Sequence, residues 1–268
     1  MAAPDLESPL AYEEIGPPTG PVVLFLHGFM GSRRDWVPVA ARLAQTQRCL
    51  LVDLPAHGET GAPEDETLWT PDGCVAALAG LLRAAGGGCV VGYSLGGRLA
   101  LQLAIEHPGS VERAAIVSAS PGIADEQARR LRREEDEHRA QRLEMHGLEP
   151  FLDDWYRLPL FAALREHPLF PEVLARRRHN DPHLLARSLR SMGAGSQRPL
   201  WADLPGIRTP LLFLAGERDL KFSALAYDAV ALCPRAEAVI LRDRGHALVE
   251  EDPAAIAEET AGFLGCWR

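Results

Sequence analysis

A serine in a glycine-flanked turn is the residue of this chain with the clearest chemical potential. Ser94 is the centre of Gly92-Tyr93-Ser94-Leu95-Gly96, a Gly-x-Ser-x-Gly pattern. The pattern is weak evidence alone, but here it follows an apolar run, 88–92, and directly precedes a predicted helix. Glycines on both sides let the backbone turn sharply, so that the serine hydroxyl is presented at the start of that helix. The sequence therefore predicts a reactive serine at position 94.

A serine hydroxyl needs a base and an acid to activate it. His246 and the segment Gly-Glu-Arg-Asp at 216–219 each come shortly after a predicted strand. Asp219 is preferred to Glu217 as the acid, because it lies further along its loop. The order serine, acid, histidine is one of the known chain orders of such triads. The sequence thus predicts a catalytic unit of Ser94, Asp219 and His246.

A developing negative charge beside this serine would need two N–H donors. The amide of Leu95, the residue after the serine, is one candidate. The amide of Phe29, in the loop after the first apolar strand, is the other. Asp53 and His57 follow another strand, and we expect them to shape their loop through hydrogen bonds.

The elements that must position these residues alternate along most of the chain. The pattern predicts strands over 21–26, 49–53, 88–92, 113–118, 210–216 and 236–241, and helices over 35–44, 71–85, 95–107, 222–232 and 253–264. Such alternation predicts an α/β fold with a doubly wound, mostly parallel sheet. The stretch 121–205 has no strand-like run and is helical and charged. We expect a core of 1–120 and 206–268, with 121–205 as a helical cap near the C-terminal ends of the strands, where such sheets carry their sites.

Composition and charge exclude several classes of protein. The chain has 268 residues, of which 47% are hydrophobic, so it can bury a large core and is neither disordered nor fibrous. The net charge, 28 − 37 = −9, argues against nucleic acid as the main partner. No apolar run approaches the roughly 20 residues of a membrane span. Because the first residues also lack a signal-peptide pattern, we expect a soluble cytoplasmic protein.

The cysteines and the remaining histidines give no sign of a metal site. The cysteine number is odd and no Cys-x-x-Cys occurs, so buried reduced thiols are expected at Cys49, Cys74, Cys89, Cys233 and Cys266. The other histidines lack metal-ligand spacing on a shared helix face. No glycine-rich phosphate loop is present, so neither a metal nor a nucleotide cofactor is expected. The oligomeric state stays open.

These residues together resemble the α/β-hydrolase superfamily over nearly the whole chain. Other motifs narrow the resemblance. Arg98 lies four residues after the serine, Asp-Trp-Tyr stands at 154–156, and Arg-Arg-His-Asn-Asp-Pro stands at 177–182. With these motifs the chain resembles the 2-succinyl-6-hydroxy-2,4-cyclohexadiene-1-carboxylate synthase family, which are lyases of menaquinone biosynthesis.

The resemblance implies an elimination rather than a hydrolysis. In that family the triad removes the proton next to a succinyl ketone, and pyruvate leaves from the ring. The substrate is a small polycarboxylate, and arginine forks bind carboxylates well. By this resemblance the residues that bind the substrate are Arg98, Arg132, Arg177, Tyr93 and Trp155.

Two positions depart from the pattern of that family. Ala56 stands where glycine is usual, and Ala247 stands where a polar residue is common. Both leave the triad intact and bear on the substrate rather than on the fold. Two alternatives therefore stay open: a carboxylate-preferring hydrolase of C–C bonds or esters, and a ligand-binding receptor that keeps a vestigial triad.

Overall fold

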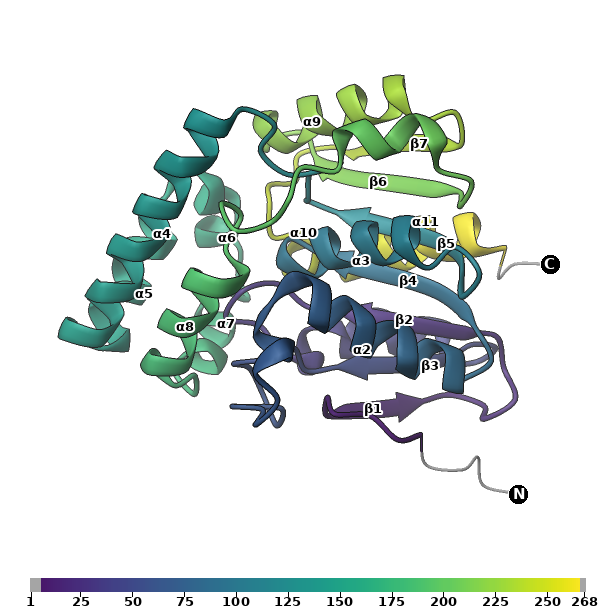
Figure 1. Ribbon diagram of the computed structural model, residues 1–268, viewed down its shortest axis with the longest axis horizontal. Helices are drawn as coiled ribbons and strands as arrows, with labels where there is room; N and C mark the ends of the chain where they lie inside the picture. The colour runs from purple at the N-terminus through teal and green to yellow at the C-terminus, as the bar shows by residue number, and fades with distance from the viewer. Residues whose placement is uncertain (1–5, 266–268) are drawn as a thin grey trace.

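The fold is built on one sheet of seven strands. The computed structural model describes residues 6–265 and has the strand order β1-β3-β2-β4-β5-β6-β7 (Figure 1). β1 pairs antiparallel with β3, and the other paired strands are parallel. The strands are β1 (Tyr12–Ile15), β2 (Val22–Leu26), β3 (Arg48–Val52), β4 (Gly88–Tyr93), β5 (Val111–Val117), β6 (Leu211–Gly216) and β7 (Ala236–Leu241). The prediction of an α/β fold with a mostly parallel sheet is confirmed.

Helices cover both faces of this sheet (Figure 1). α2, α3 and α9 pack on one face, and α1 and α11 pack on the other. The helices of the core are α1 (Val37–Leu43), α2 (Pro71–Ala84), α3 (Leu95–Glu106), α9 (Leu220–Leu232), α10 (Leu248–Glu251) and α11 (Pro253–Leu264). The start of α2 shows why these segments become helices. The Thr70 hydroxyl accepts the amide hydrogen of Gly73 at 3.1 Å, and Pro71 fills the first helical position.

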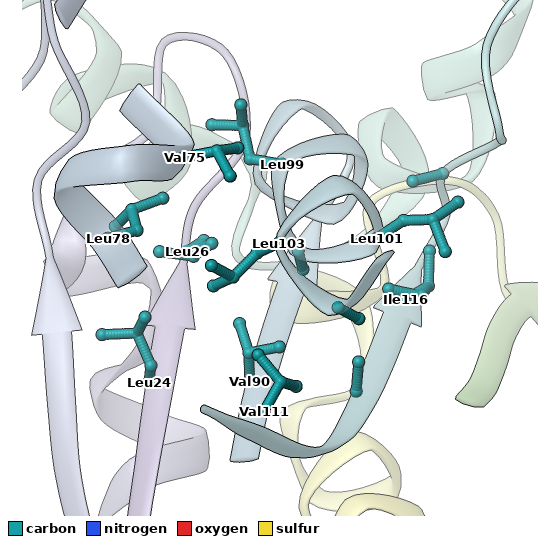
Figure 2. Close-up of a cluster of buried hydrophobic side chains, with 14 of the residues drawn as sticks. Leu24, Leu26, Val75, Leu78, Val90, Leu99, Leu101, Leu103, Val111 and Ile116 are labelled. Atoms are coloured by element: carbon teal, nitrogen blue, oxygen red, sulfur yellow. The ribbon is translucent and has the colours of Figure 1, made fainter. Parts of the chain in front are cut away.

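Burial of the strands between the two helix layers stabilises the sheet. Every residue of β2, β3, β4 and β6 is buried. Figure 2 shows Leu24 and Leu26 of β2 near Leu78 of α2 and Leu103 of α3, all of them fully buried. Full burial of one such side chain contributes about 1.5–3 kcal/mol. The loops that leave the strand ends are therefore anchored on a rigid base.

The edge strand and the first helix differ from the sequence-based expectation, and the short helix α10 was not predicted. The edge strand β1 was not predicted, because Tyr-Glu-Glu-Ile carries two exposed glutamates and no apolar run. The helix expected over 35–44 begins as a 3-10 turn, Arg33–Trp36, and becomes α-helical only at Val37. Pro38, which is tolerated in a first turn, marks that change.

A helical insertion lies between β5 and β6, beside one end of the sheet (Figure 1). Its helices are α4 (Glu126–His146), α5 (Leu148–Arg157), α6 (Ala162–Glu166), α7 (Phe170–Arg177) and α8 (Pro182–Met192). They share a small apolar core of their own, which Met30 and Ala247 of the sheet loops join. The helical insertion is confirmed, and we keep 121–205 as the proposed extent of the cap.

Other sequence-based expectations concern the cysteines and membranes. Four cysteines are buried in the structure, at positions 49, 74, 89 and 233, and Cys266 lies outside the described residues. Within residues 6–265, no helix is both long and apolar enough to cross a membrane.

Candidate active site

The backbone at Ser94 forms a strained turn between β4 and α3. Its φ and ψ are 51° and −107°, a conformation that side-chain-bearing residues rarely adopt. The turn is tight because a Cβ added to Gly96 would lie 2.2 Å from the carbonyl oxygen of Leu26, and one added to Gly92 would lie 2.2 Å from that of Gly96. The glycines therefore let the first turn of α3 lie close to the ends of β2 and β4, while the serine side chain is held at the start of the helix.

His246 lies between this serine and an aspartate. Its Nε2 is 3.4 Å from Oγ of Ser94, and its Nδ1 is 2.6 Å from Oδ2 of Asp219. Glu217, the other candidate acid, is exposed and accepts the amide hydrogen of Asp243 instead. The structure thus brings together the three residues predicted to form the triad, and its geometry favours Asp219 as the acid. Their catalytic roles are part of the proposal below.

Aromatic rings enclose the imidazole of His246, which is 2% exposed. The ring centroid of Phe222 in α9 lies 4.7 Å away, and that of Tyr93 lies 5.6 Å away. Phe161, from the helical insertion, lies 6.0 Å away and meets the imidazole edge-on. Core and insertion together therefore bury the histidine, and this burial strengthens its interaction with the aspartate.

The two predicted oxyanion-binding residues, Phe29 and Leu95, both line the cavity beside Ser94. Within residues 6–265, neither backbone amide donates a hydrogen bond to another protein group. Both N–H groups are therefore available to an incoming oxygen, and their role as an oxyanion hole stays a prediction.

Two buried histidines fix the loop that carries Phe29. His27 accepts the amide hydrogen of Leu54 at Nε2, and His57 accepts that of Met30, both at 3.0 Å. The Nδ1 atoms lie 2.8 Å from carbonyl oxygens, so each Nδ1 carries the hydrogen. Burial, with repulsion from His27, lowers the pKa of His57 to about 3. These imidazoles are neutral hydrogen-bonding links, as expected for His57.

Ala56, in the same region, occupies the left-handed conformation, with φ of 75°. Glycine reaches this conformation without strain, which explains why glycine is usual there in the family that the sequence resembles.

A cavity of about 940 Å³ separates the core from the insertion and has Ser94 and His246 in its wall. Trp155 of α5 lines it and packs against Phe29 and Phe151, with ring centroids 5.3 and 5.6 Å away. All five residues predicted to bind substrate border this cavity: Tyr93, Arg98, Arg132, Trp155 and Arg177. The three arginines differ, however, in whether protein carboxylates lie close enough to neutralise their charge.

Arg98 is a half-buried cation without an anionic partner. Its guanidinium donates to the carbonyl oxygen of Met192 at 2.8 Å and to Oε1 of Gln197 at 3.1 Å. No carboxylate of the described chain lies within ion-pair distance of it. Burial, together with repulsion from Arg132, lowers the pKa of Arg98 to about 10. The cavity therefore holds a fixed positive charge that an anion would stabilise.

Arg132, on α4, is oriented by its own helix. Its Nε donates to Oδ1 of Asp136, one turn later, at 2.8 Å. Arg132 lines the same cavity as Arg98, and its charge is close enough to lower the pKa of Arg98. The cavity that holds Ser94 is thus lined by two neighbouring arginines.

Two protein carboxylates pair with the terminal nitrogens of Arg177, whereas its buried Nε has no hydrogen-bond partner among residues 6–265. The guanidinium lies 2.9 Å from Asp35 and 2.5 Å from Oε1 of Glu250, and all three side chains are buried. Burial would raise the pKa of Asp35, but the Arg177 guanidinium holds it below its ordinary value. Burial, with repulsion from Asp35, raises the pKa of Glu250 to about 7. A role for Arg177 as a carboxylate ligand stays a prediction, and the geometry favours a structural role.

Comparison with known proteins supports what the site and fold indicate. Residues 23–259 match the profile of the "Alpha/beta hydrolase family". This chain belongs to the alpha/beta hydrolase family. It is 34% identical over 255 residues to the 2-succinyl-6-hydroxy-2,4-cyclohexadiene-1-carboxylate synthase of Salmonella schwarzengrund (strain CVM19633). The match covers 93% of this chain and 96% of that protein.

Structures and a plant protein extend the comparison. The structure of MenH from S. aureus superposes with a TM-score of 0.90 at 33% identity, covering 96% of this chain and 97% of that one. Protein PHYLLO, chloroplastic, from Arabidopsis thaliana is 32% identical over 262 residues; the match covers 91% of this chain, which spans 15% of that longer protein. The enol-lactonase from Burkholderia xenovorans LB400, at 24% identity and a TM-score of 0.78, shares the fold. The chain is therefore a MenH-like enzyme of the alpha/beta hydrolase family.

Sequence reasoning missed the acids that surround the site of this alpha/beta hydrolase. Asp35 and Glu250 hold Arg177, and Glu251 holds the loop of His246. The available signal was an acidic pair four and five residues after the histidine, in a segment that is otherwise apolar.

The raised pKa of Glu250 should make stability depend on pH. The folded protein binds this proton more tightly than the unfolded chain does, so the free energy of unfolding should fall as pH rises from 4.5 to about 7. In Glu250→Gln this fall should be reduced, because the variant has no proton to lose. Urea unfolding at about pH 5 and about pH 8 measures the difference.

Glu149→Gln is the matched control, since Glu149 is an exposed partner of Arg178. It should keep the pH dependence of the wild-type protein. Equal pH dependence in wild type and Glu250→Gln would contradict the prediction.

Proposed function

We propose that this MenH-like enzyme is a 2-succinyl-6-hydroxy-2,4-cyclohexadiene-1-carboxylate synthase. It would eliminate pyruvate from 2-succinyl-5-enolpyruvyl-6-hydroxy-3-cyclohexene-1-carboxylate, a small polycarboxylate, in the cytoplasm. The observation that carries the proposal is Arg98, which lines the same cavity as Ser94 and His246 and has no carboxylate of residues 6–265 within ion-pair distance. A substrate carboxylate supplies the missing charge, and a bidentate arginine contact also orients it.

The chemistry begins with removal of one proton. Nε2 of His246 contacts the Ser94 hydroxyl, and Nδ1 contacts Asp219. Ser94 and His246 can therefore take the proton from ring carbon 2, next to the succinyl ketone. The electron pair of that C–H bond is first delocalised onto the ketone oxygen as an enolate, and its return then forms the C2–C3 double bond. The former C3–C4 double bond becomes C4–C5, and the bond between C5 and the ether oxygen breaks. The released enolpyruvate takes a proton and becomes pyruvate.

Charge develops on the ketone oxygen as the proton leaves. The free amides of Phe29 and Leu95 would stabilise this enolate, and the amide of Leu95 also lies at the positive end of α3. Arg98 and Arg132 would bind carboxylates, while Tyr93 and Trp155 would pack against the ring. The cap then holds a charged substrate still while a single proton is moved.

The direct test is to incubate the protein with the enolpyruvyl-cyclohexene substrate and to measure pyruvate together with the diene. We expect both in equal amounts, with no acyl adduct on Ser94 in the mass spectrum of the quenched enzyme. A hydrolase would instead form a covalent acyl-serine and add water. A trapped adduct on Ser94, or carbon–carbon cleavage products in place of pyruvate, would contradict the proposal.

Arg98→Ala should lower kcat/KM for this elimination by about 1.5–3 kcal/mol, or roughly 10- to 150-fold, because a charge-assisted hydrogen bond to the substrate is lost. Steady-state pyruvate release measures the effect. Arg130→Ala, an exposed arginine of α4 outside the cavity, is the matched control and should keep the wild-type value. Full activity of a folded Arg98→Ala protein would contradict the role of Arg98 in substrate binding on which the proposal depends.

A further inference from the structure

The loop of His246 is held by a glutamate outside the proposed triad. One carboxylate oxygen of Glu251 accepts the amide hydrogen of Gly245 at 2.6 Å, and the other accepts that of Ala247 at 3.1 Å. These are the residues immediately before and after the histidine. The backbone of His246 is thus fixed on both sides by one carboxylate.

Glu251 is well placed to resist movement. It is 6% exposed, and it is the last residue of α10, two residues before Pro253 begins α11. A Cβ on Gly245 would lie 2.7 Å from Cβ of Ala163 in the insertion and 3.0 Å from Oε1 of Glu251. Only a residue without a side chain therefore fits between this carboxylate and the cap. The contact leaves the loop little freedom.

The charge of Glu251 also has no cation close to it. Among residues 6–265, no lysine or arginine lies within ion-pair distance of its carboxylate, although its charge contributes to raising the pKa of Arg218. Its partners are two neutral amides. A buried negative charge of this kind favours a positive charge nearby, and His246 becomes positive each time it accepts a proton.

We propose that Glu251 is a positioning residue for His246: it holds the two flanking amides, and its negative charge stabilises the imidazolium formed during the reaction. The inference rests on the proposed function only in taking His246 as the base that acts with Ser94. It applies to any reaction in which this pair moves a proton.

The test compares two glutamates that accept amide hydrogens from the same loop. Glu251→Gln replaces one acceptor oxygen by the NH2 group of a side-chain amide, which would face the N–H of Gly245 or Ala247 and cannot accept its hydrogen. The substitution also removes the buried charge. Glu217→Gln changes the exposed glutamate that accepts the amide hydrogen of Asp243 at 3.0 Å. Each variant is assayed for pyruvate release from the enolpyruvyl substrate and for its rate of inactivation by a fluorophosphonate. That probe phosphonylates a serine nucleophile and releases fluoride.

We expect Glu251→Gln to lower kcat about tenfold or more with little change in KM, and to slow the fluorophosphonate reaction similarly. The acid limb of its pH–rate profile should move to lower pH, because a nearby negative charge no longer favours the protonated histidine. Glu251→Asp keeps the charge with a shorter reach, so it should slow turnover and leave the acid limb near its wild-type position. Glu217→Gln should change neither.

The comparison controls for the other charges around the histidine. Those groups are Asp219, Tyr93, Glu250 with Arg177, Arg218 with Glu166, Arg244 with Asp252, and Lys221. All of them are unchanged in both variants. A shift seen in Glu251→Gln alone therefore reports the carboxylate of Glu251.

The outcomes separate this inference from the proposed function. A folded Glu251→Gln protein with wild-type kcat, or with lowered kcat and an unmoved acid limb, would overturn the inference. If Glu251→Gln does not fold, Glu251→Asp and Gly245→Ala are used instead. Wild-type rates of inactivation by the fluorophosphonate in both variants would overturn the inference. A wild-type protein that reacts with the fluorophosphonate but releases no pyruvate would contradict the proposed function alone.

Discussion

Ser94→Ala and His246→Ala should each lower kcat by about four orders of magnitude, and the double variant should be no slower than either. The reason is geometric. His246 touches both Ser94 and Asp219, so removal of one member leaves the others without their partner. Single-turnover and steady-state measurements of pyruvate release on the three variants test this non-additivity.

The assignment of Asp219 as the acid of the proposed triad needs its own comparison. Asp219→Asn should reduce turnover strongly, because the amide no longer stabilises the charged imidazole at a contact that now measures 2.6 Å. Glu217→Asn should have little effect, since that side chain points to solvent and holds only a loop amide. Near-normal turnover in Asp219→Asn together with loss in Glu217→Asn would reverse the assignment of the acid.

Arg177→Met should lower the free energy of unfolding by about 3–5 kcal/mol at neutral pH. The substitution leaves the carboxylates of Asp35 and Glu250 buried without the cation that now lies within 3 Å of both. Chemical denaturation measures the loss. Arg178→Met removes a neighbouring arginine that pairs with Glu149 at the surface, and it should cost at most about 1 kcal/mol.

A second substitution distinguishes lost charge balance from lost packing. Adding Glu250→Gln to Arg177→Met removes one of the two stranded carboxylates, so the double variant should recover part of the stability. The loss in Arg177→Met should also be smaller at about pH 5, where Glu250 is protonated. A loss that neither the second substitution nor lower pH reduces would show that packing, rather than charge, is responsible.

The sequence was informative where local patterns determine structure. Ser94 was recognisable because its glycines, the preceding strand and the following helix are adjacent in the chain, and His246 and Asp219 follow strands of the same sheet. β1 escaped prediction because an edge strand needs no apolar run and carries exposed glutamates.

The buried ion pairs could not be predicted for a different reason. Asp35 and Arg177 are 142 residues apart in the chain, and only the packing of the insertion on the core brings them together. Charged residues in Arg-rich helices are mostly exposed, so nothing local marks Arg177 as one of the buried ones. The amide contacts of Glu251 are local, but they depend on a loop conformation that no pattern specifies.

The contact of Phe161 with His246 limits how this scaffold can be diversified. Because one continuous segment supplies most of the cavity wall, exchanging it between homologous enzymes is an obvious route to new substrates. The ring of Phe161 nevertheless packs edge-on against His246, the residue that we propose as the base, with the ring centroids 6.0 Å apart. A grafted segment that lacks an aromatic side chain at this point would admit solvent to the base. We therefore expect an exchanged segment to preserve the environment of His246 only if it carries an aromatic side chain at this position.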